Sequence, residues 1–515
     1  MIERSHRRRW LAWIGVAGVF LAGTATPAVA APAVEIRPYF QDTTLAANSS
    51  GTSRVLILYA DRPTALSDVS VRYDYRTLAG KVTIAPEQAI DCAAPEPGVL
   101  LCTEPDDIEI TEGPPGSGIY GSGTEPVRIT PTDEAKTGDS GEVKVDLLVA
   151  GQRRSGYTSR VRVGEGVDLA GAPFTTHSTP PGGKVTVPLV VANVGAKAVE
   201  GFAAVFDLPY SVRTKDRFSN CLYTDDYLIS CQFDEEIPAG GRLATTLDFQ
   251  LGKDTYAPSN QSASAYFMTR ADFEDLYRVR LDAGARAAIP GSGPRLALTD
   301  APKQSRQADQ TDVGPGNNYT SWVIKITGRN GTDLVAVGDT VQGGAGAVVT
   351  ATVGFRNNGP ATLDRVNGDY EAATHTDVEL PPGTTATEVP DNCGLRRGTR
   401  TYQCSSGMLL LNGKSYTMDF RLRIDKVVPN ARGAVHVNAP CECPAGGGFA
   451  DDLKPANDRA WLTVNAASGQ GAGDDGGLPV TGVPAVLFAA LGALLLVAGG
   501  GGYLLSRRQR TRFVA

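Results

Sequence analysis

The sequence predicts an all-β protein made of tandem antiparallel β-sandwich domains. Short stretches alternate apolar side chains with others, as in "KVTVPLVVANVG" (184–195) and "AVVTATVGFRNNG" (347–359). Pro, Gly and Asn clusters separate these stretches every 8–12 residues or so, and the body of the chain has no long helical pattern. Because alternate side chains of a strand face opposite sides, such short strands are typical of sandwiches of the immunoglobulin type.

Length and composition agree with several folded domains. The chain has 515 residues, enough for about three or four domains. Gly and Pro are abundant, at 59 and 33 residues, and aromatic residues make up only 7%. Val, Leu and Tyr are still frequent enough to fill hydrophobic cores, which argues against disorder throughout the chain.

Residues 1–30 predict a signal peptide that is removed after export. Four arginines precede an apolar run from Trp10 to Gly23, and Ala28 and Ala30 form a small-x-small signal for cleavage before Ala31. The apolar run is about 14 residues long, whereas a membrane span needs about 20. The export route stays open, because consecutive arginines are typical of the twin-arginine route whereas oxidative folding of cysteines after export favours the general secretory route.

Two parts of the body repeat each other, and they predict domains 166–328 and 329–466. The matched residues occur in the same order and at similar spacing in both copies. The pairs are Asn193 and Asn357, Gly195 and Gly359, Leu208 and Leu380, Pro209 and Pro381, Asn220 and Asn392, Cys221 and Cys393, Cys231 and Cys404, and Asp248 and Asp419. Each copy closes on a similar segment, "DVGPGNNYTSWVIKI" (312–326) or "DLKPANDRAWLTV" (452–464).

The remaining segments complete the predicted domain organisation. Residues 31–165 share with the repeats a cysteine pair and the strand run before it, which predicts a diverged sandwich domain. Residues 467–477, "ASGQGAGDDGG", contain five glycines and almost no apolar side chain, as is typical of a flexible linker. Residues 478–515 form a separate C-terminal signal.

The eight cysteines predict four disulfides. In an exported chain an even count favours disulfides, and three pairs recur with gaps of 10, 10 and 11 residues, one in each third of the chain. The predicted bridges are Cys92–Cys102, Cys221–Cys231, Cys393–Cys404 and Cys441–Cys443. Zinc sites need cysteines about two to four residues apart or histidine partners, which the first three pairs lack. For Cys441 and Cys443, free thiols with a redox role stay an alternative to the disulfide.

The pattern of "NNGP", "LPPG", a cysteine pair and a closing D-x-x-P-x-N segment resembles the DUF11-like immunoglobulin-fold repeats of actinobacterial surface proteins. The resemblance covers roughly residues 166–466. Residues 166–328 depart from it by an insertion, "AGARAAIPGSGPRLALTDAPKQSRQADQ", before the closing strand. The resemblance implies a spacer or presentation module rather than an active site.

Histidines and the usual catalytic motifs give no reason to expect an enzyme. His177, His375 and His436 lie in separate segments, and the chain has neither a G-x-S-x-G elbow nor an H-E-x-x-H motif. We therefore expect no catalytic residue and no cofactor. A wall-tethered hydrolase or redox protein that uses the N-terminal domain stays the alternative.

Acidic segments and strand lysines offer weaker candidates. Residues 130–146 and 224–236 contain carboxylates that would suit calcium at a domain edge, but neither has the EF-hand order, so solvated acidic loops are favoured and no metal is expected. Lys144, Lys184 and Lys414 lie in or near strand runs, where some surface proteins cross-link Lys to Asn. The sequence does not place a partner Asn for any of them.

The C-terminus has three parts in a fixed order. Leu478-Pro479-Val480-Thr481-Gly482 fits L-P-x-T-G, residues 483–505 form an apolar run, and residues 506–515 are basic. At 1.5 Å a residue the run is about 34 Å long, enough to cross a membrane core of about 30 Å. The basic tail would then stay in the cytoplasm, which leaves the L-P-x-T-G segment just outside the membrane.

This order resembles the cell-wall sorting signal of Gram-positive surface proteins, which sortase cleaves between threonine and glycine. The resemblance implies sortase as a transient partner, peptidoglycan joined covalently through Thr481, and membrane retention only before sorting. A single-pass membrane protein is the alternative. The ligand or adhesion target is not apparent from the sequence.

Removal of both terminal signals leaves an acidic body. The whole chain has a net charge of −7; residues 1–30 contribute +3 and residues 482–515 contribute +4, so the exported body carries −14. Its lysines and arginines are scattered rather than clustered. This charge argues against nucleic acid and anionic lipid headgroups as partners. The sequence thus predicts an extracellular, wall-anchored protein with a structural or adhesive role.

Overall fold

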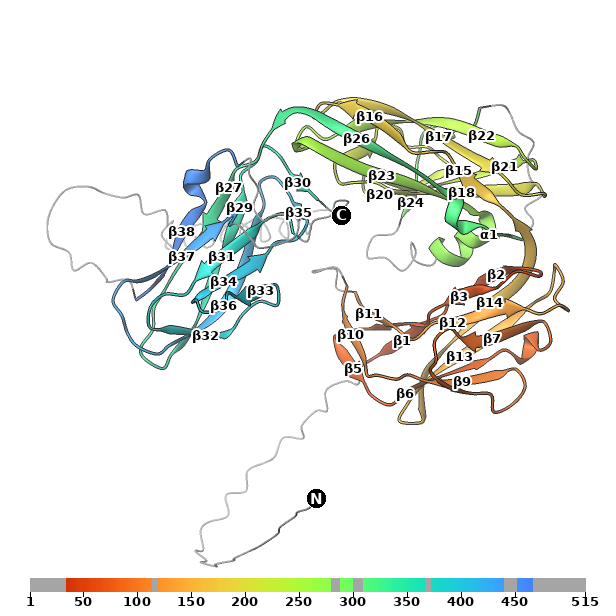
Figure 1. Cartoon of the computed structure of the whole chain (residues 1–515), viewed down its shortest axis with the longest axis horizontal. Coiled ribbons are helices and arrows are strands. Elements are labelled where there is room, and N and C mark those ends of the chain that lie inside the picture. The colour runs from red at the N-terminus through yellow and green to blue at the C-terminus, as the bar shows by residue number, and fades with distance from the viewer. Residues whose placement is uncertain are drawn as a thin grey trace, which may run out of the picture.

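Three β-sandwiches follow one another along the chain (Figure 1). The computed structural model describes residues 34–113, 119–278, 288–299, 309–365, 372–439 and 452–465. Across these residues the protein is all-β, with tandem immunoglobulin-like antiparallel sandwiches as the sequence predicts. The predicted signal helix and the predicted transmembrane segment lie outside the described residues. No helix within the described ranges combines the length and apolar character that a membrane crossing needs.

The first sandwich contains strands β1 to β14 and the short helix η1 (Arg76–Leu78). Its larger sheet has the order β2-β14-β13-β6-β9-β8, with β2 parallel to β14 and the other neighbours antiparallel. The opposite side is split into the sheets β1-β4-β11-β10-β5 and β3-β12-β7. The strands are β1 (Ile36–Tyr39), β2 (Thr43–Ala46), β3 (Thr52–Arg54), β4 (Ile57–Ala60), β5 (Thr64–Leu66), β6 (Val69–Asp74), β7 (Val82–Pro86), β8 (Asp91–Ala93), β9 (Val99–Thr103), β10 (Ile108–Glu112), β11 (Tyr120–Gly123), β12 (Val127–Pro131), β13 (Ser140–Val149) and β14 (Gln152–Val167).

The second sandwich packs a four-stranded sheet, β15-β17-β22-β19, against the sheet β16-β26-β23-β18-β21-β20-β24. Its short helices are α1 (Arg270–Phe273), η2 (Glu274–Arg278) and η3 (Pro315–Asn317). The strands of this region are β15 (Leu169–Gly171), β16 (Thr175–Thr179), β17 (Lys184–Asn193), β18 (Val199–Asp207), β19 (Val212–Thr214), β20 (Cys221–Thr224), β21 (Tyr227–Ile237), β22 (Arg242–Leu251), β23 (Ala257–Thr269), β24 (Ile289–Pro290), β25 (Gln310–Asp312) and β26 (Tyr319–Asn330).

The third sandwich packs the sheet β27-β29-β36-β32 against the sheet β28-β38-β37-β31-β34-β33, with a small pair β30-β35 beside them. The helix η4 (Pro455–Asn457) precedes its last strand. The strands are β27 (Leu334–Val337), β28 (Asp339–Val341), β29 (Val348–Asn357), β30 (Leu363–Asp364), β31 (His375–Glu379), β32 (Thr384–Glu388), β33 (Cys393–Leu395), β34 (Thr401–Ser405), β35 (Leu409–Leu410), β36 (Ser415–Ile424), β37 (Ala431–Val437) and β38 (Arg459–Val464).

The three sandwiches share one topology. Apart from β24, which adds an edge strand to the second sandwich, the sheet orders of the second and third sandwiches coincide. In both, the first strand of the large sheet (β16 or β28) runs parallel to the last strand (β26 or β38). The first sandwich has the same order of strands in its large sheet. Its other side consists of two smaller sheets, which together correspond to the small sheet of the other two sandwiches. The internal repeat found in the sequence is therefore a repeat of structure, and the first sandwich is a diverged copy.

Alternating side chains build each core. In β22, Leu243, Thr245, Leu247, Phe249 and Leu251 are buried, while the residues that alternate with them are half-buried or exposed. Such alternation places one apolar face against the opposite sheet. The second sandwich has one continuous core around Phe202, Phe233 and Trp322, to which the inserted residue Leu296 also belongs. The insertion is thus, over residues 288–299, part of the sandwich rather than a separate lobe.

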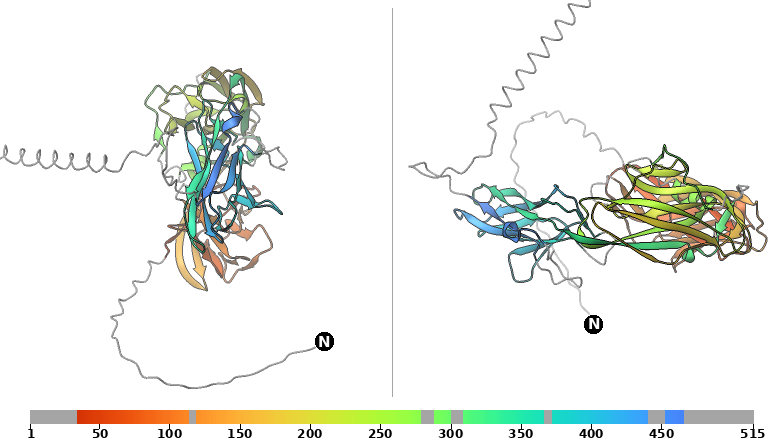
Figure 2. Two further views of the ribbon diagram at one scale, coloured as in Figure 1. Left: turned by 90° about the vertical axis from the view of Figure 1, so that its left-hand side faces the viewer. Right: turned by 90° about the horizontal axis from the view of Figure 1, so that it is seen from above.

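Very short connections join the sandwiches, with one residue between β14 and β15 and three residues between β26 and β27. β14 pairs with β13 in the first sandwich and continues to pair, through Glu165–Val167, with β25 beside the second. β26 likewise belongs to the second sandwich and ends at Asn330, four residues before β27 begins. The predicted domain boundaries at 165/166 and 328/329 fall inside these two strands. Figures 1 and 2 show that the chain turns at both junctions, so the three sandwiches are not collinear.

Candidate functional site

The residues predicted to be processed by other enzymes lie outside the described residues. These are Ala28 and Ala30 of the signal-peptide cleavage site and the sorting segment Leu478–Gly482. Cys441 and Cys443 also lie outside them, so the predicted fourth disulfide stays a prediction. The described residues instead contain the disulfides, the two junctions and one open groove.

Three of the four predicted disulfides are present. Each joins directly opposed residues of a hairpin, with Cα–Cα distances of 4.1 Å for Cys92–Cys102, 3.9 Å for Cys221–Cys231 and 4.0 Å for Cys393–Cys404. All three occupy the same hairpin of the shared topology, at the edge of the large sheet. Such bridges are typical of proteins that fold outside the cytosol.

The histidines do not form a catalytic arrangement with one another. His177 Nε2 lies 3.1 Å from Thr175 Oγ1 on β16, and His375 Nδ1 lies 3.3 Å from Ser405 Oγ. His375 and Ser405 are opposed residues of the β31–β34 ladder, so their contact is a cross-strand hydrogen bond. Burial, and after it the charge of Arg459, lowers the pKa of His436.

The acidic segments and the lysines named from the sequence lie at the surface. Asp234 forms ion pairs with Arg270 and Arg295, and Glu235 with Arg295. Within the described residues no group of three or more acidic, His or Cys side chains could hold a metal ion. Lys144, Lys184 and Lys414 are exposed, so none is buried in a core against an asparagine.

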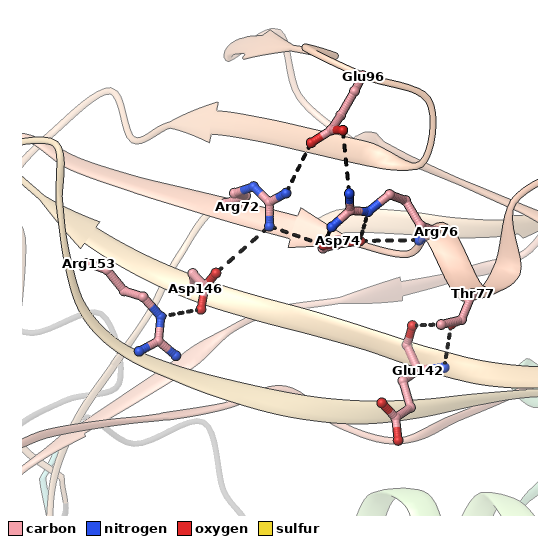
Figure 3. Close-up of polar contacts among 8 residues, drawn as sticks. All are labelled: Arg72, Asp74, Arg76, Thr77, Glu96, Glu142, Asp146 and Arg153. Carbon is pink, nitrogen blue, oxygen red and sulfur yellow. Dashed lines mark hydrogen bonds and ion pairs between the residues drawn. The ribbon is translucent and has the colours of Figure 1, made fainter.

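A network of charges covers one face of the first sandwich (Figure 3). Arg72 pairs with Asp74, Glu96 and Asp146 at 3.3, 3.4 and 3.9 Å, and Arg76 pairs with Asp74 and Glu96. The hydrogen bond from Arg76 lowers the pKa of Asp74 to about 2. These opposite charges balance one another, and each exposed pair contributes at most about 1 kcal/mol to stability.

The junction of the first two sandwiches contains a buried ion pair. Asp275, 3% exposed, follows α1 and pairs with Arg162 of β14. It also accepts a hydrogen bond of 2.7 Å from Thr44 of β2. Burial raises the pKa of Asp275, and Arg162 opposes that rise. Arg162 also pairs with Asp309 at 3.2 Å. Loss of Asp275 would still remove the buried partner of Arg162, so the pair couples the two sandwiches.

The short helix α1 holds a second buried carboxylate at this junction. Thr269 caps the helix by accepting from the Asp272 N–H. The Asp272 carboxylate accepts from the Thr311 hydroxyl at 2.8 Å and from the Asp312 N–H at 2.9 Å, both on β25. Burial raises the pKa of Asp272 to about 6. The helix therefore ties β25, and through it β14, to the second sandwich.

Hydrogen bonds cross the junction of the second and third sandwiches, and each sandwich supplies donors. The Thr362 N–H donates to the Asp254 main-chain oxygen at 2.7 Å, and the Thr362 hydroxyl donates to the Asp254 carboxylate at 2.6 Å. The Tyr210 N–H donates to Asp364 at 2.8 Å. Tyr256 of the second sandwich packs against the core cluster around Leu334 in the third. Main-chain contacts of this kind hold the orientation without a large apolar interface.

A matched corner closes each of the last two sandwiches. In the second, Asn317 donates to Asp168 at 3.0 Å and Asn318 donates to the Phe267 carbonyl at 2.9 Å. In the third, Asn457 donates to Asp333 at 2.9 Å, but Asp458 stands where the second has Asn318. Burial, with Asp452 and Asp333 nearby, raises the pKa of Asp458 to about 7. The D-x-x-P-x-N motif is thus a structural corner rather than a reactive site.

An open groove of about 990 Å³ lies between the two sheets of the third sandwich. Its walls come from β29, β31, β32, β34 and β36, and they include Phe355, Tyr416, Met418 and the bridged Cys404. Sequence reasoning did not find this groove, because it depends on which strand edges the fold leaves uncovered. The sequence carries one sign of this groove, which is that the insertion of the second copy has no counterpart in the third copy.

No protein-family model matches the chain, and no curated protein matches it. Among solved structures, the chain is similar to the I9–I11 tandem of titin, at 10% identity over 84% of this chain and 99% of that one, with a TM-score of 0.13. It is also similar to the MSCRAMM ACE of Enterococcus faecalis, at 8% identity over 57% of this chain and 96% of that one, with a TM-score of 0.15. At these values the likeness carries no argument about function.

Proposed function

We propose that this protein is a secreted surface protein that sortase attaches to peptidoglycan through Thr481, and that its sandwiches act as a non-enzymatic structural or adhesive stalk. The anchoring is supported by the order of the L-P-x-T-G segment, the apolar run and the basic tail, together with the signal peptide at the other end. The hairpin disulfides support an extracellular location.

The short connections at both junctions are the observation that carries the stalk role. A Gly-rich linker would let neighbouring domains rotate freely, whereas β14 and β26 leave few rotatable residues between sandwiches. The Arg162–Asp275 pair and the Asp254–Thr362 hydrogen bonds restrict rotation further. A chain built in this way keeps its first sandwich at a set distance from its third.

Mass spectrometry of protein released from cell walls tests the anchoring. We expect a C-terminus at Thr481 joined to a peptidoglycan stem peptide, and loss of that product in a Thr481→Ala chain. Val480→Ala is the matched control, because it changes the variable position of L-P-x-T-G and leaves the other four in place. A wall fraction that is unchanged by Thr481→Ala, or by deletion of the host's sortase, would contradict the proposal and favour the single-pass membrane protein.

A further inference from the structure

One edge of the small sheet is covered in two sandwiches and open in the third. In the first sandwich two strands, β11 and β12, take the place of β22 or β36, and β10 pairs with the first of them, β11. In the second, residues 297–299 lie along the first half of β22, where the Thr299 N–H donates to the Ala244 oxygen at 2.7 Å. In the third, β32 pairs with β36 only over Arg421–Ile424. Within the described residues no strand pairs with Ser415–Phe420 on that side.

The segment that covers β22 in the second sandwich also fills the space between the sheets. Leu296 is 4% exposed and belongs to the core. Its N–H donates to Asn220 Oδ1 at 2.8 Å, and its carbonyl accepts from Asn220 Nδ2 at 3.4 Å. The Thr245 hydroxyl donates to the Ala297 carbonyl at 2.8 Å. The sandwich therefore holds an extended peptide by its backbone and by one leucine.

The third sandwich retains the parts that hold this peptide. Asn392 corresponds to Asn220, and both donate through Nδ2 to the opposite strand, to Ser405 at 2.7 Å and to Gln232 at 2.9 Å. Asn392 is exposed, and no backbone N–H of the described residues donates to its Oδ1. Met418, which corresponds to the buried Leu247, is only half-buried in the groove wall. The third sandwich thus has a corresponding asparagine and a groove, and within its described residues no segment corresponds to 296–299.

The groove's lining defines the chemistry of a suitable peptide. Phe355, Tyr416 and Met418 make its floor and wall apolar, which suits a branched aliphatic side chain. Its rim carries the carboxylates of Glu388, Asp391 and Asp419. A basic residue next to the aliphatic one would therefore be attracted to the rim, as in the Pro-Arg-Leu order of the segment that fills the second sandwich.

We propose that the open edge of β36 and this groove bind an extended peptide strand of a partner protein. The peptide runs antiparallel to β36, places a branched aliphatic side chain between the sheets, and presents a basic residue to the acidic rim. Its backbone hydrogen bonds to β36 provide affinity, and the groove and Asn392 provide specificity. This site would be an adhesive function of the third sandwich and does not depend on wall anchoring.

A synthetic peptide with the sequence of residues 289–299, IPGSGPRLALT, is the probe for this site. The whole exported chain is titrated with the fluorescently labelled peptide, and amide hydrogen exchange locates the contact. We expect saturable one-to-one binding and slower exchange of amides in Ser415–Phe420. A peptide with aspartate at the position of Leu296 should bind at least tenfold more weakly, because a carboxylate cannot enter the apolar groove without a partner.

Two protein variants complete the test. Asn392→Ala should weaken binding about tenfold without unfolding the sandwich, because the side chain is exposed; Met418→Asp, in the groove wall, should abolish it. Arg397→Ala, an exposed residue on the same hairpin, is the control and should leave the affinity unchanged. The proposal is overturned by absence of saturation at about 1 mM peptide, by equal binding to the Asn392→Ala chain, or by protection located on β20–β22 instead of β36.

Discussion

Replacement of Asp458 by asparagine should stabilise the third sandwich and remove part of its pH dependence. Asp458 is 4% exposed, and among the described residues its Oδ1 has no hydrogen-bond partner, although a hydrogen bond with Asn438 lowers the pKa of the carboxyl group. The second sandwich has Asn318 at this position, whose Nδ2 donates to the Phe267 carbonyl. The main chain is matched as well, since the Val437 N–H donates to the Asp458 oxygen at 3.0 Å, as the Phe267 N–H does to Asn318. An asparagine at this position would therefore donate to the Val437 carbonyl.

The size of the effect follows from the pKa. Burial and the neighbouring carboxylates raise the pKa of Asp458 from 3.8 to about 7. Three pKa units correspond to about 4 kcal/mol at 1.36 kcal/mol a unit, and solvent screening at this loop reduces the effect to about 1–2 kcal/mol. Because the folded state binds the proton more tightly, stability is highest below about pH 4 for this group and falls as the pH rises to about 7. The Asp458→Asn chain should not show that fall.

Amide hydrogen exchange of β37 measures this directly, because the Val437 N–H bonds to residue 458 itself. After correction for intrinsic exchange rates, wild-type protection of β37 should fall between about pH 4 and about pH 7. Asp458→Asn protection should stay level and exceed that of the wild type at the upper end. Asn318→Asp in the second sandwich is the reciprocal control and should introduce the same fall in β23. Equal pH slopes in wild type and Asp458→Asn would refute the argument.

Four further predictions rest on particular contacts. Leu296→Ala should destabilise the second sandwich by about 2–4 kcal/mol in calorimetry, because it removes a buried side chain and loosens the segment that covers β22. Removal of the Cys393–Cys404 bridge by a double Ala substitution should cost the third sandwich about 2.5–3 kcal/mol in denaturant unfolding. Asp275→Asn should uncouple the first two sandwiches, separating their calorimetric transitions, because Arg162 loses its buried partner. Asp74→Asn should remove up to about 1 kcal/mol of stability that the wild type has above pH 4 and loses as the pH falls through about 2, as followed by circular dichroism.

Three of these predictions have a stated comparison or a refuting outcome. Leu298→Ala, at a half-buried position of the same segment, should cost less than Leu296→Ala. If Asp275→Asn left the first two sandwiches unfolding as they do in wild type, the ion pair would not couple them. Equal acid unfolding curves for wild type and Asp74→Asn would contradict the role given to the Arg76 hydrogen bond.

The strand pattern and the repeat were readable in the sequence because they depend on near neighbours. Alternating burial along β22 and β36, the turns after Asn193 and Asn357, and the hairpin cysteines all involve residues within about a dozen positions of one another. The order of signals at the two ends is local in the same way. Sandwich class, disulfide partners and the sorting hypothesis therefore needed no tertiary information.

The junctions and the groove involve residues far apart in the chain, so only the tertiary structure decided them. Arg162 meets Asp275 across more than a hundred positions, and no periodicity links them. The insertion 288–299 looked like an excursion, yet it completes a sheet edge because Leu296 returns to Asn220. The sequence by itself determined that the third copy lacks this insertion. Only the fold showed that this difference leaves a strand edge uncovered. Whether the hydrogen-bonding side of β36 has a neighbour depends on where strands from distant segments of the chain lie.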